Sequence, residues 1–135
     1  MPKRISDVSL HVYVTPEILD RIVTSVRTVL DDHLQDREVF AWRFTLPVDA
    51  ADPLHRELES QWRRTHPGAE PEGEATFEIA LSLVGEPADL TDADIADLEH
   101  GLALAVYGAA TQAVPFALRA DQRTDLEWEL DVERR

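Results

Sequence analysis

A histidine and a tyrosine on one side of a predicted strand are the residues best placed for chemistry. Residues 8–15 alternate strictly, with apolar side chains on one side and polar ones, including His11 and Tyr13, on the other. A carboxylate from Glu78 or Glu127 beside His11 would make its imidazole a general base near neutral pH, and Tyr13 would donate to a substrate oxygen. The pattern fixes no nucleophile or oxyanion hole, and a surface histidine paired with a glutamate is the alternative interpretation.

Two histidine–carboxylate pairs have the helical spacing of metal ligands. His55 and Glu59 are at positions i and i+4, and Asp97 and His100 are at i and i+3. The local sequence supplies no third ligand to either pair, so a surface contact explains each of them as well. The aspartates between residues 89 and 97 lack the glycine and terminal glutamate of an EF-hand loop, and helix capping explains them better. We therefore expect no metal and no other cofactor.

Composition argues against several classes of function. The chain of 135 residues contains no cysteine, which removes disulfides, thiolate nucleophiles and cysteine-held metal clusters. Its 13 basic and 27 acidic residues give a formal net charge of −14, which opposes binding to nucleic acid or to an anionic membrane. No apolar segment has the character of a secretion signal or the length of a membrane span, so we expect a cytoplasmic protein. Lys3 is the one lysine and all other cations are arginine, a bias typical of a GC-rich bacterial genome.

The periodicity of the apolar residues predicts four strands and three helices. Strands are expected over 8–15, 37–46, 76–84 and 125–132, and helices over 16–34, 53–65 and 91–109. Residues 67–74 are predicted to be a flexible loop and 114–118 an apolar connector. The second strand is expected to turn its larger residues toward the core: Phe40, Trp42, Phe44 and Leu46. The last strand is expected to do the same with Leu126, Trp128, Leu130 and Val132.

The alternation of all four strands predicts the fold class. A strand that is apolar on one side belongs to a sheet with helices on one face and an open second face. The order of elements then favours a single α+β domain over 1–135, a ferredoxin-like split βαβ sandwich. Its four-stranded antiparallel-type sheet has the order 4-1-3-2, and the helix over 53–65 is an addition between the second and third strands.

The open face of this sheet is the predicted binding surface. We expect it to present His11, Tyr13, Arg43, Glu78, Glu127 and Glu129. Trp62, on the helix over 53–65, is expected either to close one edge of the sheet or to anchor a partner. An acid-rich face of this kind can pair with a basic surface. A solvated face with a few ion pairs and a homodimer packed through this face are the alternatives.

These features favour a non-catalytic acidic protein that binds or regulates a macromolecule. The expected partner is a protein, most simply a basic one. The alternative is a small-molecule-binding protein or enzyme that dimerises through its open faces as an α+β barrel. In that case His11, Tyr13 and Arg43 would line a cavity.

Overall fold

In a computed structural model of the protein, residues 3–110 and 113–124 are described. They form strands and helices in the order that the sequence predicts. The strands are β1 (Arg4–Val14), β2 (Val39–Pro47), β3 (Ala75–Gly85) and β4 (Phe116–Thr124). The helices are α1 (Pro16–Leu34), α2 (Pro53–Thr65) and α3 (Asp92–Ala109), with a short 3-10 turn, η1 (Pro87–Asp89), before α3. None of the helices in these ranges is long and apolar enough to cross a membrane.

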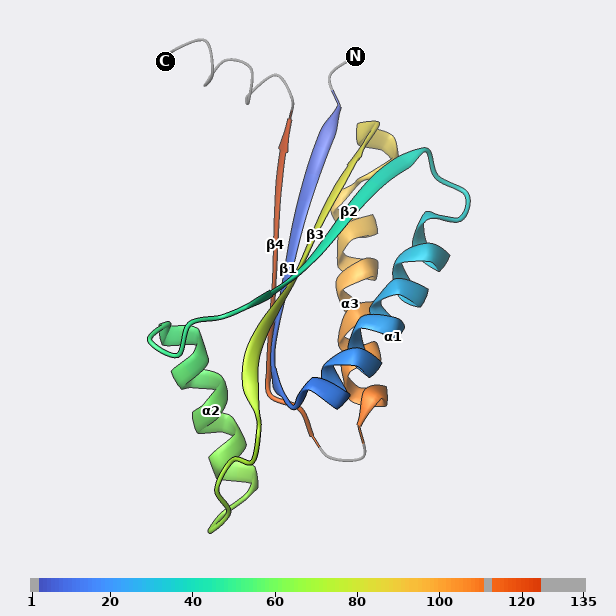
Figure 1. Cartoon of the computed structure of the whole chain (residues 1–135). Helices are drawn as coiled ribbons and strands as arrows, with labels where there is room; N and C mark the ends of the chain where they lie inside the picture. The colour runs from blue at the N-terminus through green and yellow to red at the C-terminus, as the bar shows by residue number, and fades with distance from the viewer. Residues whose placement is uncertain (1–2, 111–112, 125–135) are drawn as a thin grey trace, which may run out of the picture.

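The four strands form one antiparallel sheet in the order β2-β3-β1-β4. This order, with β1 and β3 in the centre, confirms the predicted α+β class and the ferredoxin-like arrangement. Helices α1 and α3 lie together on one face of the sheet, whereas α2 lies apart from them at one end (Figure 1). The core fills the space between the sheet and the α1–α3 pair, and its buried side chains come mainly from β1, β3, α1 and α3.

Local signals in the sequence fix where the helices begin. Thr15 caps α1 through its side chain, and Pro16 follows in the first turn, where a missing N–H is tolerated. Asp52 caps α2 in the same way ahead of Pro53. At α3, Thr91 and Asp94 form the predicted capping box, in which each side chain accepts from the backbone N–H of the other.

The orientation of β2 is the opposite of the predicted one. Ala41 and Arg43 pair with Leu83 and Leu81 of β3, which are buried under the helices. Residues directly opposite in an antiparallel pair share a face, so the odd-numbered side chains of β2 point to the helix layer. The predicted inward residues of this strand therefore lie on the open face: Phe40, Trp42, Phe44 and Leu46. The predicted open-face position of Arg43 is wrong for the same reason.

The fourth strand comes earlier in the chain than predicted. Strand β4 starts inside the segment 114–118 that was expected to be a connector. Three inward residues of β4 pack against the core: Phe116, Leu118 and Ala120. The next inward position is the polar Gln122, so the run of alternating apolar residues is short. The predicted strand over 125–132, with Glu127, Glu129 and its proposed core residues, lies outside the described residues.

Candidate interaction surface on the open sheet face

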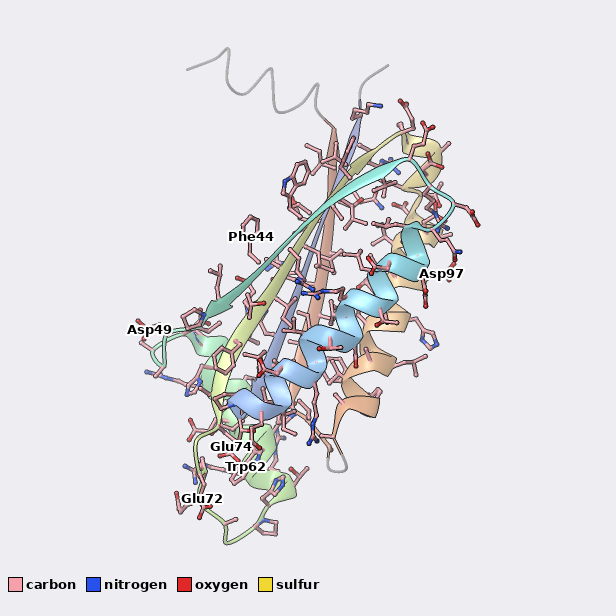
Figure 2. The ribbon with its side chains drawn as sticks, turned by 45° about the vertical axis from the view of Figure 1, so that its right-hand side comes forward. Phe44, Asp49, Trp62, Glu72, Glu74 and Asp97 are labelled. Carbon is pink, nitrogen blue, oxygen red and sulfur yellow. The ribbon has the colours of Figure 1, made fainter. Side chains whose placement is uncertain are left out.

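A row of large apolar side chains runs along the open face of β2. We call it the apolar stripe: Phe40 is 76% exposed, Trp42 51%, Phe44 58% and Leu46 49%. Phe44 projects from β2 on the side away from α1 and α3 (Figure 2). Single exposed apolar residues are ordinary, but a contiguous row of them marks a site of interaction or of aggregation.

The stripe lies on an edge strand whose backbone is regular. β2 pairs with β3 without interruption from Val39 to Pro47, so no bulge twists this edge away. Natural sheets usually protect an edge with a bulge, a proline or inward charges. Pro47 stands at the end of the strand, and Arg43 is its one charged residue. The edge is therefore open to pairing along most of its length.

A polar cluster occupies the centre of the same face. The Ser9 hydroxyl donates a hydrogen bond to Oε2 of Glu78, and Nε2 of His11 lies 3.6 Å from the same oxygen. The predicted contact between His11 and Glu78 is thus present. Ser9 is bonded to the carboxylate and not to the imidazole, so the three residues do not form the serine–histidine–carboxylate chain of a hydrolase.

The polar cluster borders a depression of about 700 Å³. Leu54 of α2 forms one wall, and Arg119 and Asp121 of β4 form another. Arg119 and Asp121 are exposed and lie 3.8 Å apart, so their ion pair is screened by water. The depression is open and is lined by both polar and apolar side chains, so it suits a small ligand with charged or hydrogen-bonding groups and an apolar part.

Helix α2 covers one end of the open face, which the sequence does not predict. Leu58 and Trp62 of α2 pack on Tyr13, with Ala117 of β4 alongside. Tyr13 and Trp62 are 3% and 8% exposed, and their rings meet edge to face at 6.3 Å. Burial, reinforced by the Glu59 and Glu74 carboxylates, raises the pKa of the Tyr13 hydroxyl. Trp62 is thus a packing residue inside this protein, but it packs on the central strand β1 and does not close an edge of the sheet.

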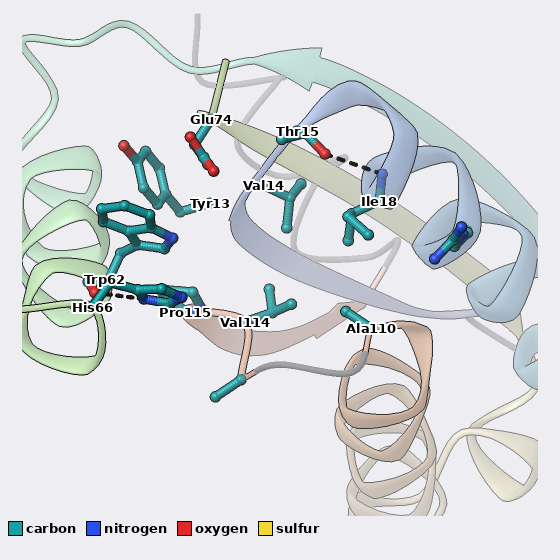
Figure 3. A pocket seen from close by; sticks show the side chains of 12 residues that line it. Tyr13, Val14, Thr15, Ile18, Trp62, His66, Glu74, Ala110, Val114 and Pro115 are labelled. Carbon is teal, nitrogen blue, oxygen red and sulfur yellow. Dashed lines mark hydrogen bonds between the residues drawn. The ribbon is translucent and has the colours of Figure 1, made fainter. Parts of the chain in front are cut away.

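A smaller cavity of about 170 Å³ lies between α2, the start of α1 and the segment before β4 (Figure 3). Tyr13, Trp62 and Glu74 line one side of it, and Val114 and Pro115 line the other. Trp62 stacks on His66 with ring centroids 4.3 Å apart, and the imidazole Nδ1 is 2.9 Å from the Trp62 carbonyl oxygen. The imidazole of His66 therefore covers one face of the Trp62 ring.

The His55–Glu59 pair is held by contacts within the protein. Nδ1 of His55 lies 2.6 Å from the Thr76 hydroxyl, and Nε2 lies 3.2 Å from Oε2 of Glu59. Nδ1 thus joins α2 to β3, whereas Nε2 is engaged within α2. Within residues 3–110 and 113–124, no group of three or more histidine, aspartate or glutamate side chains is arranged to hold a metal ion.

The structure brings together some of the predicted site residues and separates others. His11 and Glu78 meet on the open face, whereas Tyr13 is buried under α2 and Arg43 points to the helix layer. The exposed apolar stripe was missed. Its signal is that the second side of β2 is partly apolar as well, with Val39 and Ala41 beside Arg43 and Thr45, so the alternation alone does not fix which side faces inward.

Comparison with known proteins identifies no family for this chain. No family model matches the sequence, and no curated protein matches it. A crystal structure of an amidase of the hydantoinase/carbamoylase family from Burkholderia multivorans is similar at a TM-score of 0.43 and 14% identity, covering 89% of this chain and 27% of that one. An amidase of the same family from Burkholderia vietnamiensis gives 0.40 and 12%, with 91% and 29% covered. The chain spans less than a third of either amidase, and these likenesses carry no functional argument.

Proposed function

We propose that this protein is a non-catalytic interaction protein that docks onto another protein through the apolar stripe of β2. The observation that carries the proposal is the exposure of about half or more of each of Phe40, Trp42, Phe44 and Leu46. Burying aromatic side chains in a contact supplies much of the binding energy of protein interfaces. A row of them on a rigid strand loses little entropy on binding, because the backbone is already fixed by its pairing with β3.

The charges around the stripe favour a basic partner. Glu78 lies directly opposite Leu46 in the sheet, and Glu38 and Asp49 flank the ends of the strand. Together with the net charge of −14, these carboxylates would steer a positively charged surface toward the stripe. We therefore propose a partner with an apolar centre and a rim of arginine or lysine, acting in the cytoplasm. The same charge disfavours nucleic acid as the partner.

The test is capture of partners from cells that contain the protein, with matched variants. Phe44→Asp places a carboxylate in the stripe, and Leu104→Asp places the same group on an exposed apolar position of α3. A protein that binds the wild type and the Leu104 variant but not the Phe44 variant, and that binds again when purified and titrated by calorimetry, supports the proposal. Equal binding to both variants, or no bound protein, contradicts it.

The depression beside the polar cluster favours a second candidate function, binding of a small ligand with charged groups. Glu78 and Asp121 would recognise a cationic group and Arg119 an anionic one, with His11 and Ser9 as hydrogen-bonding partners. A screen of small zwitterionic compounds by thermal shift tests it. A compound that stabilises the wild type but not Glu78→Gln would favour this function over docking through the stripe.

A further inference from the structure

We propose that two copies of this chain pair antiparallel along their β2 edges, so that the four strands of each copy form one continuous sheet. This inference rests on the proposed function in that it uses the same apolar stripe as a contact surface. It adds the identity of one occupant of the β2 edge, a second copy, and the register in which it binds.

The backbone of β2 shows which residues are free to pair. The N–H of Val48 donates to the carbonyl oxygen of Thr76, and these two residues continue the register of β2 with β3. Backbone groups alternate sides along a strand, so the even-numbered residues of β2 bond to β3. The N–H and C=O groups of Val39, Ala41, Arg43 and Thr45 therefore point to the free edge, where a second strand would bind them.

The two-fold symmetry of such a dimer limits the registers. Paired residue numbers must add up to an even sum, because an odd sum would place the stripes on opposite faces of the joined sheet. With an even sum, the odd-numbered residues of one copy, whose N–H and C=O groups point to the free edge, also lie opposite odd-numbered residues of the other. These backbone groups can then bond to each other. The β2 edge is thus self-complementary. The registers that let the free backbone groups bond to each other are also the ones that place both apolar stripes on the same face.

Arg43, Pro47 and the length of the paired segment together select one register from this set. Placing the axis at Arg43 would set two arginines directly opposite each other, which destabilises a pair of strands. Placing it at Phe44 would set Pro47, which has no N–H, opposite Ala41, where a hydrogen bond is needed. Placing it at Trp42 avoids both, pairs Ala41 with Arg43 of the other copy and joins residues 39–45 of each strand. An axis nearer the start of β2 also avoids both but pairs fewer residues of the strand. We therefore assign the axis to Trp42, so that Phe40 of one copy faces Phe44 of the other.

Charge favours a second copy at this edge and not across the whole open face. The strand Val39–Pro47 contains no carboxylate, although the chain has a net charge of −14. Stacking two open faces would bury the polar centre of the face, including Asp7, His11 and Glu78, next to the carboxylates of the other copy. Pairing along the edge leaves that centre in water. It also places the two stripes side by side on one face, where they enlarge the surface for a partner.

Single cysteines test the register cleanly, because the natural chain has none. Residues in a non-hydrogen-bonded pair have Cα atoms about 4.5 Å apart, within the range that a disulfide spans. In the full-length chain, Trp42→Cys should form a disulfide dimer under mild oxidation. A mixture of Phe40→Cys and Phe44→Cys, which keeps Trp42, should form the mixed dimer well above either variant alone. Leu104→Cys on α3 is the exposed control and should give at least tenfold less dimer.

Sedimentation of the unmodified protein and of each variant, with folding checked by circular dichroism, completes the experiment. A dimer of twice 15.2 kDa with the expected cross-links supports the inference. A monomer at submillimolar concentration, or cross-linking at position 104 equal to that at 42, overturns it. Cross-linking that peaks at Arg43→Cys or Phe44→Cys overturns the register. A monomer that still captures a partner through Phe44 leaves the proposed function standing, so the two failures are distinguishable.

Discussion

At the residue scale, the end of α1 holds a histidine in a setting that opposes its protonation. Burial lowers the pKa of His33, and the Arg37 guanidinium lowers it further, while Asp94 and Asp97 act in the opposite direction. Nε2 of His33 is buried and has no hydrogen-bond partner among the described residues. Arg37 donates to the His33 carbonyl oxygen and lies 3.2 Å from Oδ1 of Asp94, so the three residues connect α1 to α3.

This setting predicts a loss of stability at mildly acidic pH. The pKa of His33 in the folded protein is below its ordinary value of about 6.5, so the unfolded chain takes up the proton first. The free energy of unfolding should fall as the pH drops through this value toward the lower, folded-state pKa. His33→Gln should flatten the decline, whereas the exposed His100→Gln should leave it unchanged. Urea titrations at a series of pH values measure the free energy of unfolding of each variant. The same pH dependence in the His33 and His100 variants would contradict the prediction.

Two tryptophans give a matched test of burial. Trp62 packs on Tyr13, whereas Trp42 is half exposed on the stripe. Trp62→Ala should therefore cost about 3–5 kcal/mol of unfolding free energy, and Trp42→Ala no more than about 0.5 kcal/mol in dilute solution, where copies do not associate. Chemical denaturation followed by circular dichroism makes the comparison. Equal losses would mean that α2 does not pack on the sheet as described.

At the element scale, the capping box ties the start of α3 to an ionised carboxylate. Hydrogen bonds from Thr91, with help from Arg37, hold the pKa of Asp94 below its ordinary value. The stabilisation is therefore complete above about pH 4, the usual value for aspartate, and is lost as the pH falls through the folded-state pKa. The start of α3 is thus stabilised by the Thr91–Asp94 box, and one of the two side chains in it titrates.

Asp94→Asn should lower the free energy of unfolding by roughly 1 kcal/mol near neutral pH, the usual scale of a helix cap. Its stability should then change less than that of the wild type between about pH 5 and pH 2, because the titrating group is gone. Asp97→Asn, one turn further along α3, is the control with no part in the box. Thermal unfolding across this pH range gives both quantities, and a full acid dependence in Asp94→Asn would argue against the capping role.

At the scale of the whole molecule, net charge and the apolar stripe act in opposite directions. Two copies carry −14 each and repel one another, whereas the strand that joins them is free of carboxylates. A basic partner is instead attracted by the same charge. Salt screens both effects, since the Debye length falls from about 10 Å at 0.1 M to about 3 Å at 1 M.

The two associations should therefore respond to salt with opposite signs. Raising NaCl from about 0.1 M to about 1 M should tighten the β2 dimer severalfold and weaken the basic partner roughly tenfold. Sedimentation equilibrium measures the first and calorimetric titration the second. A dimer that dissociates in salt would indicate contacts between opposite charges, which β2 does not supply.

The sequence by itself determined the three helices, the first three strands and the order of the strands in the sheet. Strict alternation in residues 8–15 and 76–84 leaves one choice of inward side, and Thr91 with Asp94 leaves one start for α3, because these signals come from neighbours in the chain. Local information also placed His11 and Glu78 on the same side of the sheet, although the sequence left open whether Glu78 or Glu127 lies beside His11. The pairing of β1 with β3 brings Glu78 to this position.

Only the tertiary structure decided which side of β2 faces inward and where the fourth strand lies. Both sides of β2 carry apolar residues, although one side also holds Arg43 and Thr45. Its facing therefore depends on the space left at the margin of the helix layer, where Val39 already lies against Gly85. A Cβ at Gly85 would be 2.9 Å from Cγ2 of Val39. The closely packed side takes the small residues, and the aromatic ones turn outward. That outcome, set by packing between segments far apart in the chain, creates the surface on which both proposals depend.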